Sequence, residues 1–166
     1  MDGAMMLPEF DHEFAETRKS LERVPEEKFD WKPHAKSWSL HELAAHCAEV
    51  PQWVGPTLMM DGFDLDAPHE RIVPKTKAEI LAHFDEGVAA AREIIEGTTG
   101  DALGQIWTMT KGGKVELSMP KGAVLRSFIF SHNVHHRAQL GVYLRLLDVP
   151  VPGHYGPSAD EMMAEA

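Results

Sequence analysis

Two histidines four residues apart are the feature of this sequence that most directly suggests chemistry. His132 and His136 lie in an apolar-periodic stretch, residues 121–149, which contains no proline and therefore predicts a helix. On a helix, residues four apart point in nearly the same direction, so two imidazoles can bind one metal ion. With ten histidines in 166 residues, chance also produces such pairs. Two core histidines held by hydrogen bonds are therefore the competing interpretation.

A third histidine, His46, lies on a second predicted helix, one turn after Glu42 and beside Cys47 at the apolar edge. Helical bundles commonly build metal sites from side chains on facing helices, so His46 can join His132 and His136 if the two helices are neighbours. Three neutral imidazoles leave a coordination position for water or substrate, as in catalytic metal sites. Such a site suits Zn, Ni, Fe or Co, and ligand type does not choose among them.

Three further residues are candidates for a role beside the imidazoles. Glu49 follows His46 by three residues, close enough to hydrogen-bond its second ring nitrogen or, less readily, to act as a base. Gln139 and Tyr143 lie one and two turns beyond His136 on the same predicted face. A solvated carboxylate is the common alternative for Glu49. Core packing is the favoured interpretation of Gln139 and Tyr143, with substrate orientation second, so no residue is assigned as catalytic.

Other reactive residue types near these positions are expected to be structural. His135 lies about 100° around the helix from His136, so it cannot easily share the metal with both ligands. Arg137 points away from the histidine pair, which predicts an ion pair that stabilises the bundle. Cys47 is expected to be a buried, inert thiol. The tryptophans could wall a pocket, although they more often anchor loops in a core: Trp31, Trp38, Trp53 and Trp107.

Four amphipathic segments are predicted to form the helices that position these side chains. They span about residues 8–23, 40–50, 76–96 and 121–149. The second begins after Ser39, whose spacing to Glu42 is that of a capping box. Pro51 and Pro56 each lack a backbone donor, so this helix should bend or be interrupted after His46.

The segments between the helices predict one excursion from a helical fold. Residues 61–74, with two prolines and a glycine, indicate a connection. Residues 105–119 give a weak hairpin signal, with Gly112 and Gly113 as a plausible tight turn. We therefore expect an all-α four-helix bundle with a short hairpin or loop excursion between the third and fourth helices, in a single domain over residues 1–166.

The C-terminal tail is unusually rich in turn-forming and polar residues. Ser158 and Glu161 have the spacing of a capping box and predict a last short helix. A chain end docked on the bundle is the simplest interpretation. A tail that covers the mouth of the site or contacts a dimer partner is the alternative.

Composition and charge limit the class of protein. The chain has 26 acidic against 16 basic residues, a net charge of −10, and no basic stripe, which argues against nucleic-acid binding. No apolar run approaches the roughly 20 residues of a membrane span. The single cysteine, Cys47, cannot form an intramolecular disulfide, and the first residues do not form a secretion signal. These features predict a soluble cytoplasmic protein.

Three stretches carry a family resemblance, namely residues 38–46, the His-x-x-x-His-Arg-x-Gln helix over residues 132–139, and residues 150–161. Together they resemble the DinB-like superfamily over essentially the whole chain. The resemblance implies a four-helix bundle, a homodimer, and a metal site whose ligands by motif position are His46, His132 and His136. The implied cofactor is one divalent ion, with Zn or Ni favoured and Fe, Co or Mn as further candidates.

Known activities of the superfamily include metal-dependent thiol transferases, a thiol-dependent isomerase and proposed hydrolases. By this resemblance we expect a divalent-metal-binding protein of the thiol S-transferase type, with a small-molecule thiol or electrophile as partner. A metal-activated thiolate needs no acidic motif beside the histidines, which mildly favours a transferase over a metal-dependent hydrolase. A non-catalytic metal-binding or stress protein, and a plain helical bundle with core histidines, remain as alternatives.

Overall fold

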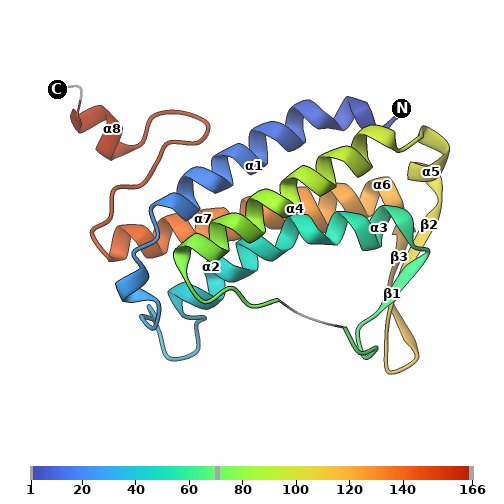
Figure 1. Cartoon of the computed structure of the whole chain (residues 1–166), viewed down its shortest axis with the longest axis horizontal. Coiled ribbons are helices and arrows are strands. Elements are labelled where there is room, and N and C mark those ends of the chain that lie inside the picture. Colours follow the sequence, from blue (N-terminus) through green and yellow to red (C-terminus); the bar gives the residue numbers. More distant parts are fainter. Residues whose placement is uncertain (1, 70–71, 165–166) are drawn as a thin grey trace.

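The protein, represented by a computed structural model that describes residues 2–69 and 72–164, is built around four helical segments (Figure 1). These are α1 (Leu7–Glu22), α2 (Leu40–Glu49) with its continuation α3 (Val54–Met59), α4 (Lys77–Gly97), and a C-terminal segment that ends in α7 (Ser131–Leu146). Helix α1 packs against α4 and α7, and α2 packs against the same two helices. The helices that carry the three histidines, α2 and α7, are therefore neighbours. None of the described helices is long and apolar enough to cross a membrane.

Side-chain caps set where two of these helices begin. Ser39 Oγ accepts a hydrogen bond of 3.1 Å from the Glu42 amide, and Glu42 Oε2 accepts one of 2.6 Å from the Ser39 amide. This reciprocal pair is the predicted capping box. Thr76 Oγ1 likewise accepts a hydrogen bond from the Glu79 amide at 3.1 Å and begins α4.

Proline ends α2 where the sequence predicts an interruption. The α-helix stops at Glu49, and the chain passes through a 3-10 turn, Val50–Trp53, before α3 begins. Pro51 has no amide hydrogen to donate, so the regular hydrogen-bond pattern cannot continue through it. The predicted break after His46 is confirmed, and it leaves His46 in the last turn of α2, at the end that faces α3.

A small three-stranded sheet lies at one end of the helices (Figure 1). Strands β2 (Ile106–Lys111) and β3 (Lys114–Pro120) form an antiparallel hairpin. Gly112 and Gly113 join them with φ values of 57° and 72°, a left-handed turn that glycine adopts without steric cost. The predicted hairpin between the third and fourth helices is thereby confirmed.

The third strand corrects the all-α prediction. Within the predicted connection, β1 (Gly62–Asp64) pairs in parallel with β2, with Gly62 opposite Thr108. A side chain at Gly62 would place its Cβ 2.3 Å from the Thr108 carbonyl oxygen, so this approach requires glycine. The fold is mostly helical with a small mixed sheet, and not a purely α-helical bundle. A strand of three residues is too short for alternation to reveal it.

The C-terminal helical segment is regular only in part. Helix α6 (Lys121–Val124) leads into a π-helical stretch, Leu125–Phe130, which is followed directly by α7. A π turn holds more residues than an α turn, so it shifts the helical phase of every side chain that follows. Apolar periodicity alone predicts one uniform helix over residues 121–149. The wider turns end immediately before α7, whose second residue is His132.

Aromatic rings fill the centre of the helical body. Phe10, Phe14, Phe84 and Phe130 are each at most 1% exposed, and their ring centroids lie 4.4–6.3 Å apart in successive pairs. Such ring pairs add specific packing to the area that they bury. The remaining short elements are the 3-10 turns Gly3–Met6 and Glu26–Lys28, α5 (Gly100–Gly104) and α8 (Ala159–Ala164).

The C-terminal tail packs along α1 and ends in α8. The Ser158 hydroxyl accepts a hydrogen bond of 3.2 Å from the Glu161 amide, which confirms the predicted cap. His154 Nδ1 lies 3.1 Å from Glu16 Oε2 of α1, and Asp160 is paired with an arginine of α7. The tail is therefore docked between α1 and α7, whereas the three histidines lie between α7 and α2.

Candidate metal centre

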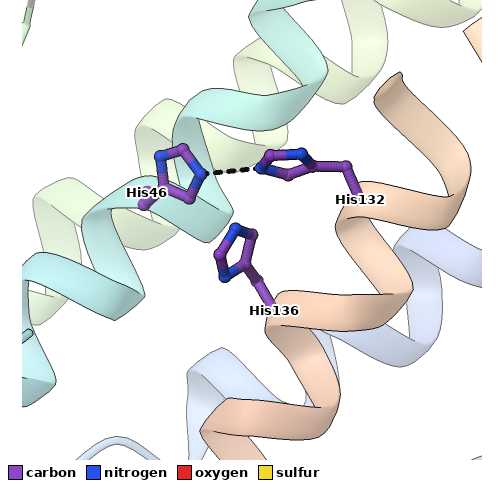
Figure 2. A group of neighbouring side chains, drawn as sticks. All are labelled: His46, His132 and His136. Atoms are coloured by element: carbon purple, nitrogen blue, oxygen red, sulfur yellow. Dashed lines mark hydrogen bonds between the residues drawn. The ribbon is translucent and has the colours of Figure 1, made fainter. Parts of the chain in front are cut away.

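Three imidazoles from two neighbouring helices converge on one point (Figure 2). His46 projects from α2, while His132 and His136 project from successive turns of α7. Ligand nitrogens from the three rings all lie within 4.8 Å of one another. Nε2 of His46 is 2.9 Å from Nε2 of His132. The structure thus brings together the three histidines that the sequence singles out as candidate ligands.

Two polar side chains orient the rings from outside the cluster. Gln139 Oε1 lies 2.7 Å from His136 Nδ1. A carbonyl oxygen can only accept, so Nδ1 carries the hydrogen and Nε2 of His136 carries the lone pair. Glu49 Oε2 lies 3.5 Å from His46 Nδ1, on the same helix. Partners of this kind fix the tautomer and orientation of metal-binding histidines.

The cluster disfavours protonation of its own rings. Burial, and after it the imidazoles of His136, His46 and His135, lower the pKa of His132 to about 4. Burial also lowers the pKa of His136, although the hydrogen bond with Gln139 acts in the opposite direction. His132 and His136 are therefore held in their neutral form, which has the free lone pair that a metal ligand needs.

The donor set fits a divalent transition metal. In the contact between His46 and His132, one nitrogen at most can donate a hydrogen to the other. The neutral cluster therefore has more acceptor nitrogens than hydrogens to share, and a divalent cation would satisfy all three lone pairs at once. Three nitrogen ligands without a carboxylate among them suit Zn, Ni, Fe or Co better than Mg or Ca.

Tryptophans enclose the histidines on two sides. Trp38 stacks on His136 with ring centroids 5.5 Å apart, and its ring lies 4.9 Å from that of His46. Trp53 lies 5.4 Å from His46 and 5.1 Å from His132. The sequence placed the tryptophans in a pocket wall only as the less common alternative, since spacing does not show which loop folds over a helix. These rings shield the nitrogen cluster from water.

Tyr143 acts on the site only through Trp38. Its hydroxyl donates a hydrogen bond of 3.2 Å to the Trp38 carbonyl oxygen, and its ring packs edge-on against Trp31 at 5.6 Å. Tyr143 packs against the hydrophobic core, which confirms the favoured prediction, and its hydroxyl also holds the loop that carries Trp38. The sequence feature that singled out Tyr143 was its position two turns beyond His136 on the same face of the helix.

The remaining predictions concern residues next to the ligands. His135 is exposed, and its nitrogens are outside the group that converges. Arg137 is 2% exposed and pairs with Glu13 at 2.7 Å, which confirms the predicted ion pair. Cys47 is fully buried, and burial raises the pKa of its thiol to about 12, so the prediction of a buried, unreactive thiol is confirmed.

Comparison with known proteins gives concordant matches. A family model described as the DinB superfamily matches residues 9–140. The uncharacterized protein YrdA of Bacillus subtilis strain 168 is 26% identical over 159 residues, which cover 93% of this chain and 89% of YrdA.

Two solved structures share the fold. A DinB-like protein of Bacillus cereus has a TM-score of 0.70 and 22% identity, with 90% of this chain and 95% of that chain covered. The DinB-like protein YjoA of Bacillus subtilis has a TM-score of 0.67 and 16% identity, with 90% and 97% covered. At these identities the two structures bear on the fold alone.

Proposed function

The chain belongs to the DinB superfamily, and from the geometry of its histidines we propose that it is an enzyme that uses one divalent metal ion. His46, His132 and His136 would hold the ion. The observation that carries the proposal is the convergence of their nitrogens within 4.8 Å, in a setting whose burial lowers the pKa of His132 and His136. Zn and Ni are the favoured ions, with Fe, Co and Mn as further candidates.

For the reaction we favour transfer of a small-molecule thiol to an electrophile. A divalent ion held here would supply the Lewis acidity that lowers the pKa of a thiol and gives a nucleophile at neutral pH. In the transfer, a sulfur–carbon bond forms, the leaving group departs with the electron pair of its bond to carbon, and the thiol proton passes to solvent. Gln139 and Glu49 would keep the imidazoles oriented, and Trp38 and Trp53 would exclude water.

Hydrolysis is the second candidate, and one observation supports it. Glu49 and His132 both line the same pocket, so the Glu49 carboxylate faces the space in which a substrate would bind beside the metal. A carboxylate in that place could take a proton from water during hydrolysis. Glu49→Gln separates the two reactions, because the glutamine keeps an oxygen that can accept from His46 Nδ1 but cannot take a proton from water. Hydrolysis should therefore fall by about 10²-fold or more while thiol transfer changes little.

Metal analysis is the first test. Protein purified without a polyhistidine tag or chelator should contain about one ion per chain by inductively coupled plasma mass spectrometry. His46→Ala, His132→Ala and His136→Ala should each lose the ion while far-ultraviolet circular dichroism stays helical. His135→Ala is the matched control, because this neighbouring histidine is exposed and outside the cluster, and it should keep the ion. A wild-type protein that takes up none of Zn, Ni, Fe, Co and Mn would refute the proposal.

Activity is the second test. A metal-loaded protein should accelerate the reaction of a small thiol such as cysteine with 1-chloro-2,4-dinitrobenzene, and the histidine-to-alanine variants should not. A protein that binds one ion yet accelerates neither thiol transfer nor ester hydrolysis would be a metal-binding protein without catalysis. The homodimer implied by the family resemblance stays a prediction that light scattering can check.

A further inference from the structure

A pocket of about 650 Å³ opens beside the histidine cluster. The helical body forms one wall through α3 and the 3-10 turn before it, the π-helical stretch and α7 form another, and strands β1 and β2 form a third. His132 lines its inner end, so the pocket and the nitrogen cluster share a side chain. This volume lies within the usual range for sites that hold a small organic molecule.

The pocket wall is made mainly of aromatic and aliphatic side chains. Those that dominate it are Trp53, Phe63, Trp107, Met109, Phe128 and Ile129. The polar groups of two wall residues are already used: Trp107 Nε1 donates to the Pro56 carbonyl oxygen at 3.1 Å, and Gln52 Nε2 donates to the His83 carbonyl oxygen at 2.9 Å. A ligand therefore meets ring faces and hydrocarbon over most of the pocket.

The pocket offers an anion no permanent positive charge, since its basic lining residues are the histidines His69, His83 and His132. Neither lysine nor arginine lines it within residues 2–69 and 72–164, and its one acidic lining residue is Glu49. A carboxylate or phosphate buried there would lose its hydration without an ion pair in return, which is strongly unfavourable. The net charge of −10 adds a general repulsion of anions.

From these observations we propose that this pocket binds the apolar, uncharged body of an organic substrate, with its reacting group at the His132 end. The identification of the ligand as a substrate rests on the proposed function, since the reaction would take place at the metal. The affinity for an apolar, uncharged body rests on the pocket wall alone. Trp53 lies 5.1 Å from His132, so a planar ligand that packs on this ring also reaches the cluster.

Two probes with the same ring system test the charge preference. Equilibrium dialysis of the metal-free protein should show that 2-naphthalenemethanol binds at least about tenfold more tightly than 2-naphthoate, because only the second carries a charge into the pocket. Equal affinities, or tighter binding of the carboxylate, would overturn the proposal. Metal analysis of the protein as purified is a separate measurement, so a failure to bind metal would refute the proposed enzyme without changing the dialysis result.

Two lysine variants of the hairpin locate the binding. Met109→Lys places a cation in the pocket wall and should reverse the preference between the two probes. Binding of the alcohol should become about tenfold weaker and binding of the carboxylate about tenfold tighter. Val115→Lys is the matched control, since Val115 lies on the adjacent strand and is 63% exposed outside the pocket. Unchanged binding of both probes in a folded Met109→Lys protein would overturn the proposal. If circular dichroism shows that Met109→Lys is unfolded, Met109→Trp fills the same space without charge and should weaken both probes.

Discussion

Polar side chains gather in two places along α7, and the two places differ in how those side chains are satisfied. Between α7 and α2 lies the histidine cluster of His46, His132 and His136. Between α7 and α1 lies a second polar group, here called the tail clasp, which consists of Glu13, Glu16, Ser20, Arg137, His154 and Tyr155. Both groups contain residues of α7. Hydrogen-bond donors and acceptors match in the tail clasp but do not match in the histidine cluster.

In the tail clasp, donors and acceptors match. Arg137 donates to the Glu13 carbonyl oxygen at 2.8 Å, to Glu13 Oε2 at 2.7 Å and to the Tyr155 hydroxyl at 2.7 Å. The Tyr155 hydroxyl donates in turn to the Glu13 carboxylate. His154 bridges Glu16 Oε2 and Ser20 Oγ at 3.1 Å each. A buried group of this kind is complete without a ligand.

In the histidine cluster, acceptors outnumber the hydrogens available to them. His136 gives the hydrogen on its Nδ1 to Gln139, which leaves its Nε2 as an acceptor. Between His46 and His132, at most one Nε2 can donate to the other, so the hydrogens inside the cluster are fewer than the nitrogens that need one. The comparison teaches that burial of polar residues does not identify a functional site by itself. An imbalance of donors and acceptors does, because something outside the chain is needed to correct it.

The largest expected effect of a single substitution is in the tail clasp. Arg137→Met should lower the free energy of unfolding by about 3–5 kcal/mol, because it leaves the Glu13 carboxylate buried without its counter-charge. Arg145→Met is the matched control on the same helix. Its partner Asp160 is solvent-accessible, so the loss there should be much smaller. Urea denaturation measures both, and equal losses in the two variants would contradict the distinction between a buried and an exposed pair.

The histidine cluster should respond to metal and the tail clasp should not. Adding Zn²⁺ to 100 times its dissociation constant should raise the free energy of unfolding of the wild type by about 2.7 kcal/mol. His132→Ala should remove this gain, whereas Ser20→Ala should keep it. Urea titrations with and without the ion measure the difference. A similar gain in wild type and His132→Ala would mean that the ion binds elsewhere.

Acid should weaken the metal-free protein through His132. In the folded chain its pKa is about 4, below the ordinary 6.5, so between these values the unfolded chain binds more protons. Stability is therefore full above pH 6.5 and declines as the pH falls toward 4, by about 1–2 kcal/mol after allowance for the partial exposure of the ring. Urea denaturation of metal-free protein at a series of pH values measures this slope. His132→Gln should flatten it, and an equally steep slope in that variant would assign it to other groups.

Sequence reasoning succeeded where structure depends on near neighbours. The Ser39 and Ser158 caps and the Gly112 turn follow from residues within a few positions of each other, and all three form. To predict that the three histidines converge, it was enough to know the helix periodicity and to take the two helices as neighbours. In each case the sequence pattern contained all the residues that form the structure.

Sequence reasoning failed where structure depends on distant partners. Strand β1 exists because it pairs with β2 more than 40 positions later, and its three residues carry too little pattern to show this. The π-helical stretch replaces a predicted regular turn, and propensity does not distinguish the two. The position of Trp38 over His136 depends on Tyr143, more than 100 positions away. Long-range contacts decided the first and the third.

The smallest expected effect concerns the part of the tail clasp that most resembles the active site of an enzyme. Ser20, His154 and Glu16 form a serine–histidine–carboxylate chain with contacts of 3.1 Å, the arrangement of an activated nucleophile. Ser20 is completely buried, so a substrate cannot reach its hydroxyl. The wild type should therefore resist labelling by a fluorophosphonate, and Ser20→Ala should cost only about 1 kcal/mol of stability and leave thiol transfer unchanged. If the wild type is labelled and Ser20→Ala is not, the tail clasp must open to let the reagent in. The tail clasp would then be the catalytic group and the histidine cluster the structural one.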